Sequence, residues 1–239
     1  MAPETIVLLH GFTQTGRSWG PTIAALGERY RALAPDIRGH GSTSDARPVD
    51  FGSVQADVLA LAPERFALAG YSMGGRIALS LALDPAAATH VTRLVLVGAS
   101  PGIADAAERR TRRAADEALA DRIEGEGIEA FAREWAALPL WTGQPTAVAA
   151  AANAERLRQS PAGLAAALRG LGTGVMEPLW ERLPQLTIPV ALIVGERDGK
   201  FRAIAERMAS ALPDATLHVV AGVGHAVQLE APGAVAALL

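Results

Sequence analysis

The pentapeptide Gly70-Tyr-Ser-Met-Gly74 lies between a short apolar run and a longer run rich in Ala and Leu. The first run, Arg65–Ala69, has the length of a buried strand, and the second, Gly75–Leu83, is typical of a helix that ends before Pro85. A serine at such a strand-to-helix turn sits in a sharp bend that exposes its hydroxyl above the sheet. The flanking glycines leave room for this bend. The pattern predicts that Ser72 is a reactive hydroxyl; the alternative is a glycine-rich turn without chemistry.

The composition limits what else the chain contains. Its 239 residues are enough for one large α/β domain with an insertion, and a hydrophobic content of 50% is enough to fill its core. The absence of cysteine excludes disulfides, thiolate metal sites and a cysteine nucleophile. A net charge of -3 gives no reason to expect a nucleic-acid partner.

No segment indicates a membrane or a bound cofactor. The first residues lack a basic region, and the apolar run Ile6–Leu9 is too short for a signal sequence or for the roughly 20 residues that span a bilayer. We therefore expect a cytoplasmic protein. Gly170, Gly172 and Gly174 follow a predicted helix instead of a strand, so they do not form a dinucleotide-binding turn, and we expect neither a cofactor nor a metal.

Short apolar runs alternate with longer Ala- and Leu-rich runs, which predicts a mostly parallel sheet with helices on both faces. The predicted strands are Thr5–Leu9, Arg31–Ala34, Phe66–Ala69, Leu94–Val97, Val190–Val194 and Thr216–Val220. The predicted core helices are Trp19–Gly27, Ser53–Leu61, Met73–Leu83, Arg202–Leu212 and Pro232–Leu239. Ligands of such sheets bind beyond the carboxyl ends of the strands, where Ser72 is expected.

Residues 101–187 contain no strand pattern. They predict helices over Ala106–Ile123, Gly127–Ala137, Thr146–Gln159, Ala162–Leu171 and Pro178–Leu183. In Ser160-Pro161, the serine is expected to cap the fourth of these helices. A connection this long between two strands predicts a helical lid over residues 101–187, inserted into a core of residues 1–100 and 188–239.

A reactive serine needs a histidine to accept its proton and an acid to orient that histidine. Asp198 follows the strand Val190–Val194, and His225 follows Thr216–Val220. A single Asp or His in a loop is commonly a solvated turn residue. Three such residues, each after a strand and in the order Ser, Asp, His, predict a catalytic triad of Ser72, Asp198 and His225.

Other residues near these turns also suggest roles. The turn His10-Gly-Phe12 is expected to place the Phe12 amide beside that of Met73 as an oxyanion hole, with His10 itself structural. Arg76, four residues after Ser72, shares its helical face, and either faces the active hydroxyl or forms a salt bridge elsewhere. Trp135 and Trp141 belong either to the lid core or to the pocket wall.

The motifs together resemble the α/β-hydrolase superfamily, through His10-Gly-Phe12, Asp36-Ile-Arg-Gly-His-Gly41, Gly70-Tyr-Ser-Met-Gly-Gly-Arg76, Gly195-Glu-Arg-Asp198 and Gly222-Val-Gly-His225. More narrowly, the chain resembles the 2-succinyl-6-hydroxy-2,4-cyclohexadiene-1-carboxylate synthases of menaquinone biosynthesis. The narrower marks are Ser100-Pro-Gly-Ile103, Glu108-Arg-Arg-Thr-Arg-Arg113, Phe131-Ala-Arg-Glu-Trp135, Leu157-Arg-Gln-Ser160 and Gly195-Glu-Arg-Asp-Gly-Lys-Phe-Arg202.

The resemblance implies an α/β-hydrolase fold with lyase activity. The substrate of that family, 2-succinyl-5-enolpyruvyl-6-hydroxy-3-cyclohexene-1-carboxylate, loses a proton and then expels pyruvate. Ser72 would act as the base with His225 and Asp198, and no acyl-enzyme would form.

The resemblance also implies the binding residues. Arg76, Arg112 and Arg158 match the arginines that hold the three substrate carboxylates, and Tyr71, Trp135 and Trp141 match pocket positions. Two other functions stay open on the sequence. One is a serine hydrolase acting on an ester, thioester or carbon–carbon bond. The other is a ligand-binding protein on the same scaffold, although such proteins often lose a member of the triad.

Overall fold

The computed structural model describes residues 3–239 and contains a six-stranded sheet in the order β2-β1-β3-β4-β5-β6. Every neighbouring pair is parallel, as the sequence predicted. The strands are β1 (Glu4–Leu9), β2 (Tyr30–Leu33), β3 (Phe66–Tyr71), β4 (Val91–Val97), β5 (Val190–Gly195) and β6 (Ala215–Val220).

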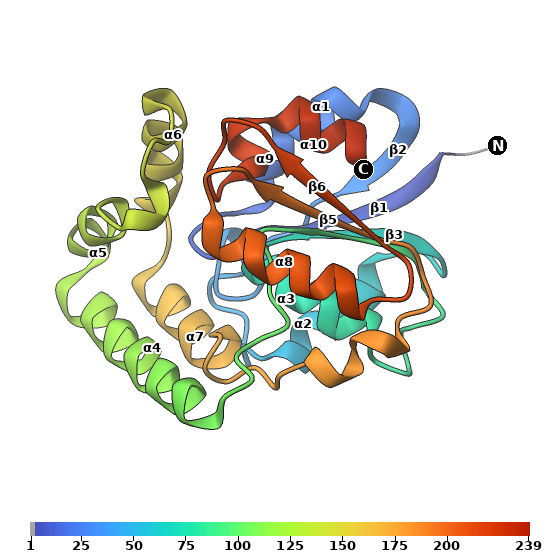
Figure 1. The fold of residues 1–239 in the computed structure, drawn as a ribbon. Coiled ribbons are helices and arrows are strands. Elements are labelled where there is room, and N and C mark those ends of the chain that lie inside the picture. The colour runs from blue at the N-terminus through green and yellow to red at the C-terminus, as the bar shows by residue number, and fades with distance from the viewer. Residues whose placement is uncertain (1–2) are drawn as a thin grey trace.

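Helices cover both faces of the sheet because successive strand residues point to opposite sides. In β1, Val7 and Leu9 belong to one buried cluster, while Ile6 and Leu8 belong to another. The first cluster is covered by α2 (Phe51–Leu61), α3 (Met73–Ala82) and α8 (Gly199–Ala211). The second is covered by α1 (Gly20–Leu26), α9 (Val227–Glu230) and α10 (Pro232–Leu238), on the other side of the sheet in Figure 1.

Four helices are inserted between β4 and β5, namely α4 (Ala106–Glu126), α5 (Ile128–Ala136), α6 (Thr146–Arg156) and α7 (Pro161–Leu171). Figure 1 shows α4, α5 and α6 as a separate layer beside the sheet. The Ser160 hydroxyl accepts a hydrogen bond from Gly163 N, so the expected cap of α7 is present. Two expectations were inaccurate: α6 ends at Arg156, and the last predicted helix is a 3-10 helix, Trp180–Gln185.

Two sets of contacts fix the inserted helices. On the surface, Arg169 of α7 forms ion pairs with three carboxylates of α4, those of Glu117, Asp121 and Glu124. In the interior, Trp135 of α5 packs on Phe12 of the loop after β1, with ring centroids 5.3 Å apart. This second contact brings the insertion over the loop that follows a carboxyl strand end.

Within residues 3–239, no helix is both long enough and apolar enough to cross a membrane.

Candidate active site

Ser72 occupies the bend between β3 and α3, with φ +51° and ψ -107°. A non-glycine residue in this region is strained by about 1–3 kcal/mol, which the surrounding structure must hold in place. The glycines on either side are needed because a Cβ on Gly70 would lie 2.3 Å from the Gly74 carbonyl oxygen. A Cβ on Gly74 would lie 2.2 Å from the carbonyl oxygen of Leu9 in β1. Helix and sheet therefore meet at glycine backbone, and the serine is held at the sheet edge.

The structure brings together the three residues of the predicted triad. His225 Nε2 lies 3.3 Å from Ser72 Oγ, and His225 Nδ1 donates to Asp198 Oδ2 over 2.6 Å. Asp198 and His225 are both buried. The second oxygen of Asp198 accepts from the amide of Phe201 and so caps α8. The carboxylate is therefore fixed at two points, and the imidazole presents Nε2 to the serine.

The buried side chain of Glu230 fixes the loop that carries His225. Glu230 Oε2 accepts from the Gly224 amide at 3.1 Å and from Arg197 Nη2 at 2.9 Å. Arg197 Nη1 also donates to the carbonyl of Gly143 in the insertion, at 2.7 Å. These bonds connect the loops of the acid and the histidine with the inserted segment.

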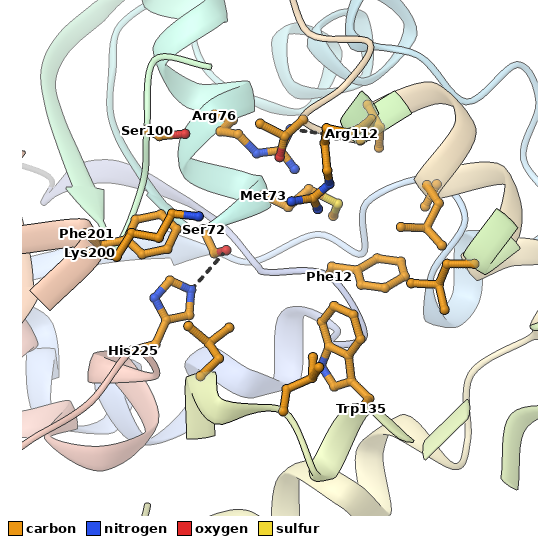
Figure 2. Close-up of a pocket in the computed structure, with 18 of the residues that line it drawn as sticks. Phe12, Ser72, Met73, Arg76, Ser100, Arg112, Trp135, Lys200, Phe201 and His225 are labelled. Atoms are coloured by element: carbon orange, nitrogen blue, oxygen red, sulfur yellow. Dashed lines mark hydrogen bonds between the residues drawn. The ribbon is translucent and has the colours of Figure 1, made fainter. Parts of the chain in front are cut away.

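A cavity of about 330 Å³ opens in front of Ser72 (Figure 2). It lies between the core loops and the inserted helices. Its wall includes Phe12, Met73, Arg76, Arg112, Trp135, Lys200, Phe201 and His225.

Arg76 and Arg112 bring two guanidinium groups to this cavity. Arg76 Nη1 donates to the carbonyl of Leu171 at 2.7 Å, and within residues 3–239 no carboxylate forms an ion pair with it. Burial and then the charge of Arg112 lower the pKa of Arg76 to about 10. Arg112 Nε donates to Oδ1 of the buried Asp116 at 2.7 Å. Of the two alternatives, the structure therefore shows Arg76 facing the cavity instead of forming a distant salt bridge.

Arg158 does not reach the Ser72 cavity, contrary to the expectation from the resemblance. It is exposed, pairs with Glu155, and lines a different groove with Arg17. The helix α6 ends at Arg156, and Arg158 lies in the turn that follows, where its amide donates to the Glu155 carbonyl. The side chain of Arg156 points into the protein instead.

Arg156 is the functional candidate that the sequence analysis missed. Its side chain is buried and lines a small cavity beside Phe12 and Trp141. Nη1 donates to the Asn153 side chain at 3.1 Å, and among the described residues Nε has no hydrogen-bond partner. Burial lowers the pKa of Arg156 to about 10. The packing of α6 on the core and its end at Arg156 decide which of the two arginines is buried, and spacing in the sequence supplies neither.

The three predicted aromatic residues occupy different places. Trp135 lines the Ser72 cavity. Trp141 does not, but its ring lies 6.0 Å from that of His225 and its Nε1 donates to the Trp135 carbonyl. Tyr71 is buried, with its ring 5.3 Å from that of His225, and burial raises the pKa of its hydroxyl. Trp141 and Tyr71 thus pack around the histidine instead of forming this wall.

Phe12 and Met73 both line the cavity, as expected for an oxyanion hole. Met73 is the first residue of α3, so its amide has no acceptor within the helix. In the described part of the chain the Phe12 amide donates no hydrogen bond. Both amides are therefore free to donate to a ligand.

Two buried histidines support the Phe12 turn. His10 Nδ1 donates to the Gly11 carbonyl, and its Nε2 accepts from the Ile37 amide at 2.8 Å. The ring of His40 packs edge-on against that of His10, at 5.1 Å. Burial lowers the pKa of His10 to about 4, and burial together with the charge of His10 lowers that of His40 to about 3. Both are structural imidazoles that are neutral at pH 7.

Over residues 3–239 no group of three or more His, Cys, Asp or Glu is placed to hold a metal ion.

Comparison with known proteins agrees with this geometry. Residues 6–238 match the alpha/beta hydrolase family. The chain belongs to this family. A Klebsiella pneumoniae protein named 2-succinyl-6-hydroxy-2,4-cyclohexadiene-1-carboxylate synthase is 33% identical over 98% of this chain and 91% of that protein. A Bacillus subtilis protein is 37% identical over 97% of this chain and 87% of that protein. Its assignment to the same enzyme is provisional.

The solved structures agree with the sequences. The structure of MenH from S. aureus superposes with a TM-score of 0.92 and 32% identity, covering 98% of this chain and 91% of that one. Within the alpha/beta hydrolases, the chain therefore belongs to the 2-succinyl-6-hydroxy-2,4-cyclohexadiene-1-carboxylate synthase family, and both levels of the resemblance are confirmed.

Proposed function

We propose that this protein is a carbon–oxygen lyase that eliminates pyruvate from 2-succinyl-5-enolpyruvyl-6-hydroxy-3-cyclohexene-1-carboxylate, a step of menaquinone biosynthesis. Family membership supports the reaction. The observation that carries the proposal is the pair Arg76 and Arg112 in the same cavity as Ser72. A guanidinium binds a carboxylate through two parallel hydrogen bonds, and a polycarboxylate substrate gives these arginines a ligand.

The triad geometry supports Ser72 as the base of this elimination. The serine proton passes to His225 Nε2, and Asp198 stabilises the imidazolium that forms. The serine oxygen removes the proton from the substrate ring. The electron pair of that C–H bond, at ring carbon C2, forms the C2–C3 double bond. The existing C3–C4 double bond shifts to C4–C5 and the C5–O bond breaks, so pyruvate leaves as its enolate. The imidazolium of His225 then donates its proton to this enolate, and the resulting enol becomes pyruvate.

The amides of Phe12 and Met73 are proposed to form the oxyanion hole. Proton loss beside the succinyl carbonyl places negative charge on its oxygen. Two backbone donors aimed at that oxygen stabilise the charge as it develops, without reorganisation. Their location at the cavity wall beside Ser72 supports this role.

Three arginines are proposed to hold the substrate, with Arg156 in the role that the resemblance assigned to Arg158. Arg76 and Arg112 line the main cavity, and Arg156 lies beside Phe12 and Trp141. Each hydrogen bond to a charged group contributes about 1.5–3 kcal/mol. Trp135 supplies an apolar wall for the ring.

The test is incubation with the enolpyruvyl substrate, with pyruvate release followed through lactate dehydrogenase. The wild-type protein is expected to release one pyruvate per substrate. Arg76→Ala is expected to lose about 100-fold or more in kcat/KM, because a buried charged hydrogen bond disappears. Arg122→Ala is the matched control, since Arg122 is exposed on the insertion and pairs with Glu134. Equal turnover by Arg76→Ala and the parent would overturn the carboxylate role.

A serine hydrolase is the second candidate, because the same Ser72–His225 geometry serves acyl transfer. Rapid turnover of p-nitrophenyl esters with a covalent adduct on Ser72 would favour it. A ligand-binding protein would show binding that Ser72→Ala leaves unchanged and no turnover. The cytoplasmic location stays a prediction of the sequence.

A further inference from the structure

A second cavity, of about 530 Å³, lies on the other side of His225. Its wall includes Thr142, Gly143 and Arg197. The two cavities share Pro139, Leu140, Lys200 and His225. They therefore meet beside the triad, and a small molecule formed at Ser72 has a second compartment next to it.

Lys200 stands at this junction. It is the second residue of α8, and its Nζ lies 5.9 Å from the centre of the Phe201 ring. Figure 2 shows its side chain reaching toward Ser72 from the α8 side, with Arg112 beyond that serine. Its ammonium therefore approaches the reacting region from a direction that the arginines do not cover.

The charge of Lys200 is unpaired, unlike that of its neighbours. Arg197 pairs with Glu230, and Arg202 pairs with Glu206. For Lys200, the described residues provide no carboxylate within ion-pair distance. It is also the one lysine among the 22 Lys plus Arg residues of the chain. A chain that uses arginine almost everywhere else has an ammonium at the active-site junction.

The proposed substrate has more negative charges than the arginine sites have net positive charges. The buried Asp116 pairs with Arg112, and its charge also acts on Arg76 without pairing with it, so these three groups carry one net positive charge. Arg156 supplies a second. The proposed substrate carries three carboxylates, one each on the ring, the succinyl arm and the enolpyruvyl group. One carboxylate therefore lacks a matching cation.

We propose that Lys200 binds the carboxylate of the leaving pyruvate, and that the second cavity is the exit for this small 2-oxo acid. The inference rests on the proposed elimination. When the ring C–O bond breaks, the leaving group is an enolate that carries its own carboxylate. An ammonium beside it stabilises the separating charge. A rotatable point charge also releases a small acid more readily than a rigid guanidinium fork does.

The experiment titrates the probe pyruvate into the protein, followed by calorimetry and by its inhibition of turnover. Lys200→Met is expected to weaken pyruvate binding by about 10- to 100-fold, the effect of one charge-assisted hydrogen bond. It is expected to lower kcat/KM for the enolpyruvyl substrate by a similar factor. Lys200→Arg retains the charge and is expected to restore most of the binding.

Arg202→Met is the matched control, because it removes one charge from the same end of α8 at a residue that lines neither cavity. Its pyruvate affinity is expected to stay within about twofold of wild type, because Arg202 is already paired with Glu206 and lies outside both cavities. Equal affinities of Lys200→Met and Arg202→Met would overturn the inference, as would wild-type protein that does not bind pyruvate.

The two proposals fail separately. If the wild type releases pyruvate from the enolpyruvyl substrate and Lys200→Met matches it, the Lys200 inference alone is wrong. If no variant releases pyruvate, the proposed elimination is wrong, and the pyruvate titration still decides whether Lys200 binds a 2-oxo acid. Thermal unfolding of each variant checks that the exposed substitutions leave the fold intact.

Discussion

At the scale of the residue, the site depends on where two arginines at the end of α6 point. Arg156 is buried and without a carboxylate partner in the described structure, while Arg158 is exposed beside Glu155. A buried guanidinium has lost much of its hydration, which depresses its pKa and favours an anionic ligand. The exposed arginine is already solvated and paired, so it has little to gain from a substrate.

We predict that Arg156→Met lowers kcat/KM for the enolpyruvyl substrate by about 10- to 100-fold, since it removes a charged donor from the binding region. Arg158→Met is its control and is expected to stay within about threefold of wild type. The coupled pyruvate assay measures both. Methionine fills much of the buried volume, and thermal unfolding checks that Arg156→Met is folded. Equal losses in the two variants would contradict the assignment.

At the scale of the element, the approach of α3 to the sheet positions Ser72. A Cβ on Gly74 would overlap the carbonyl of Leu9, and a Cβ on Gly70 would overlap the carbonyl of Gly74, so the backbones approach closely at both glycines. No side chain separates helix from strand at this point, so the height of the serine above the sheet is set by direct backbone contact. This explains why the strained φ of Ser72 is maintained.

Gly74→Ala is predicted to destabilise the protein by about 1–3 kcal/mol or more and to abolish activity, because its Cβ would overlap β1. Gly125→Ala in α4 is the matched control, since a Cβ there meets nothing within 4 Å. Removing a helical glycine is expected to gain up to about 1 kcal/mol. Urea unfolding compares the two variants. A Gly74→Ala protein with wild-type stability would show that helix and strand separate easily.

Much of this element-scale organisation was predictable from local sequence. The apolar runs predicted all six strands, and Ser160-Pro161 predicted the start of α7, because caps and strands depend on nearby residues. The short α9 was not predicted, since Val227–Glu230 spans only four residues and has no helical period to detect. The phase of α6 was also unpredictable, because it depends on tertiary packing. The resemblance placed Arg158 at the substrate, whereas the structure exposes Arg158 and buries Arg156.

At the scale of the whole molecule, the buried imidazoles connect stability with pH. His10 and His40 are neutral in the folded protein, with pKa values lowered by burial to about 4 and about 3. In the unfolded chain they titrate near 6.5. Below that pH the unfolded state binds more protons than the folded state, so acid favours unfolding.

We predict that the free energy of unfolding is level above about pH 7 and falls as the pH decreases from 6.5 toward 4. The loss is up to about 1.4 kcal/mol per imidazole for each pH unit. Urea titrations at pH 7.5, 6 and 5 measure it. Repeating them at high salt screens the surface charges and leaves the buried contribution. A stability that does not change between pH 7.5 and 5 would contradict neutral burial of the pair.

The bond from Arg76 to the Leu171 carbonyl ties the segment after the serine to the far end of the insertion. The two partners are 95 positions apart in the chain. Transplanting a foreign insertion from a hydrolase of neutral esters would thus replace the cavity wall and also release this guanidinium from its anchor. The backbone of the insertion can thus be exchanged, but the binding of anions depends on both the core and the insertion. A chimera must keep Arg76 and a carbonyl in the position of that of Leu171 to retain a preference for anionic substrates.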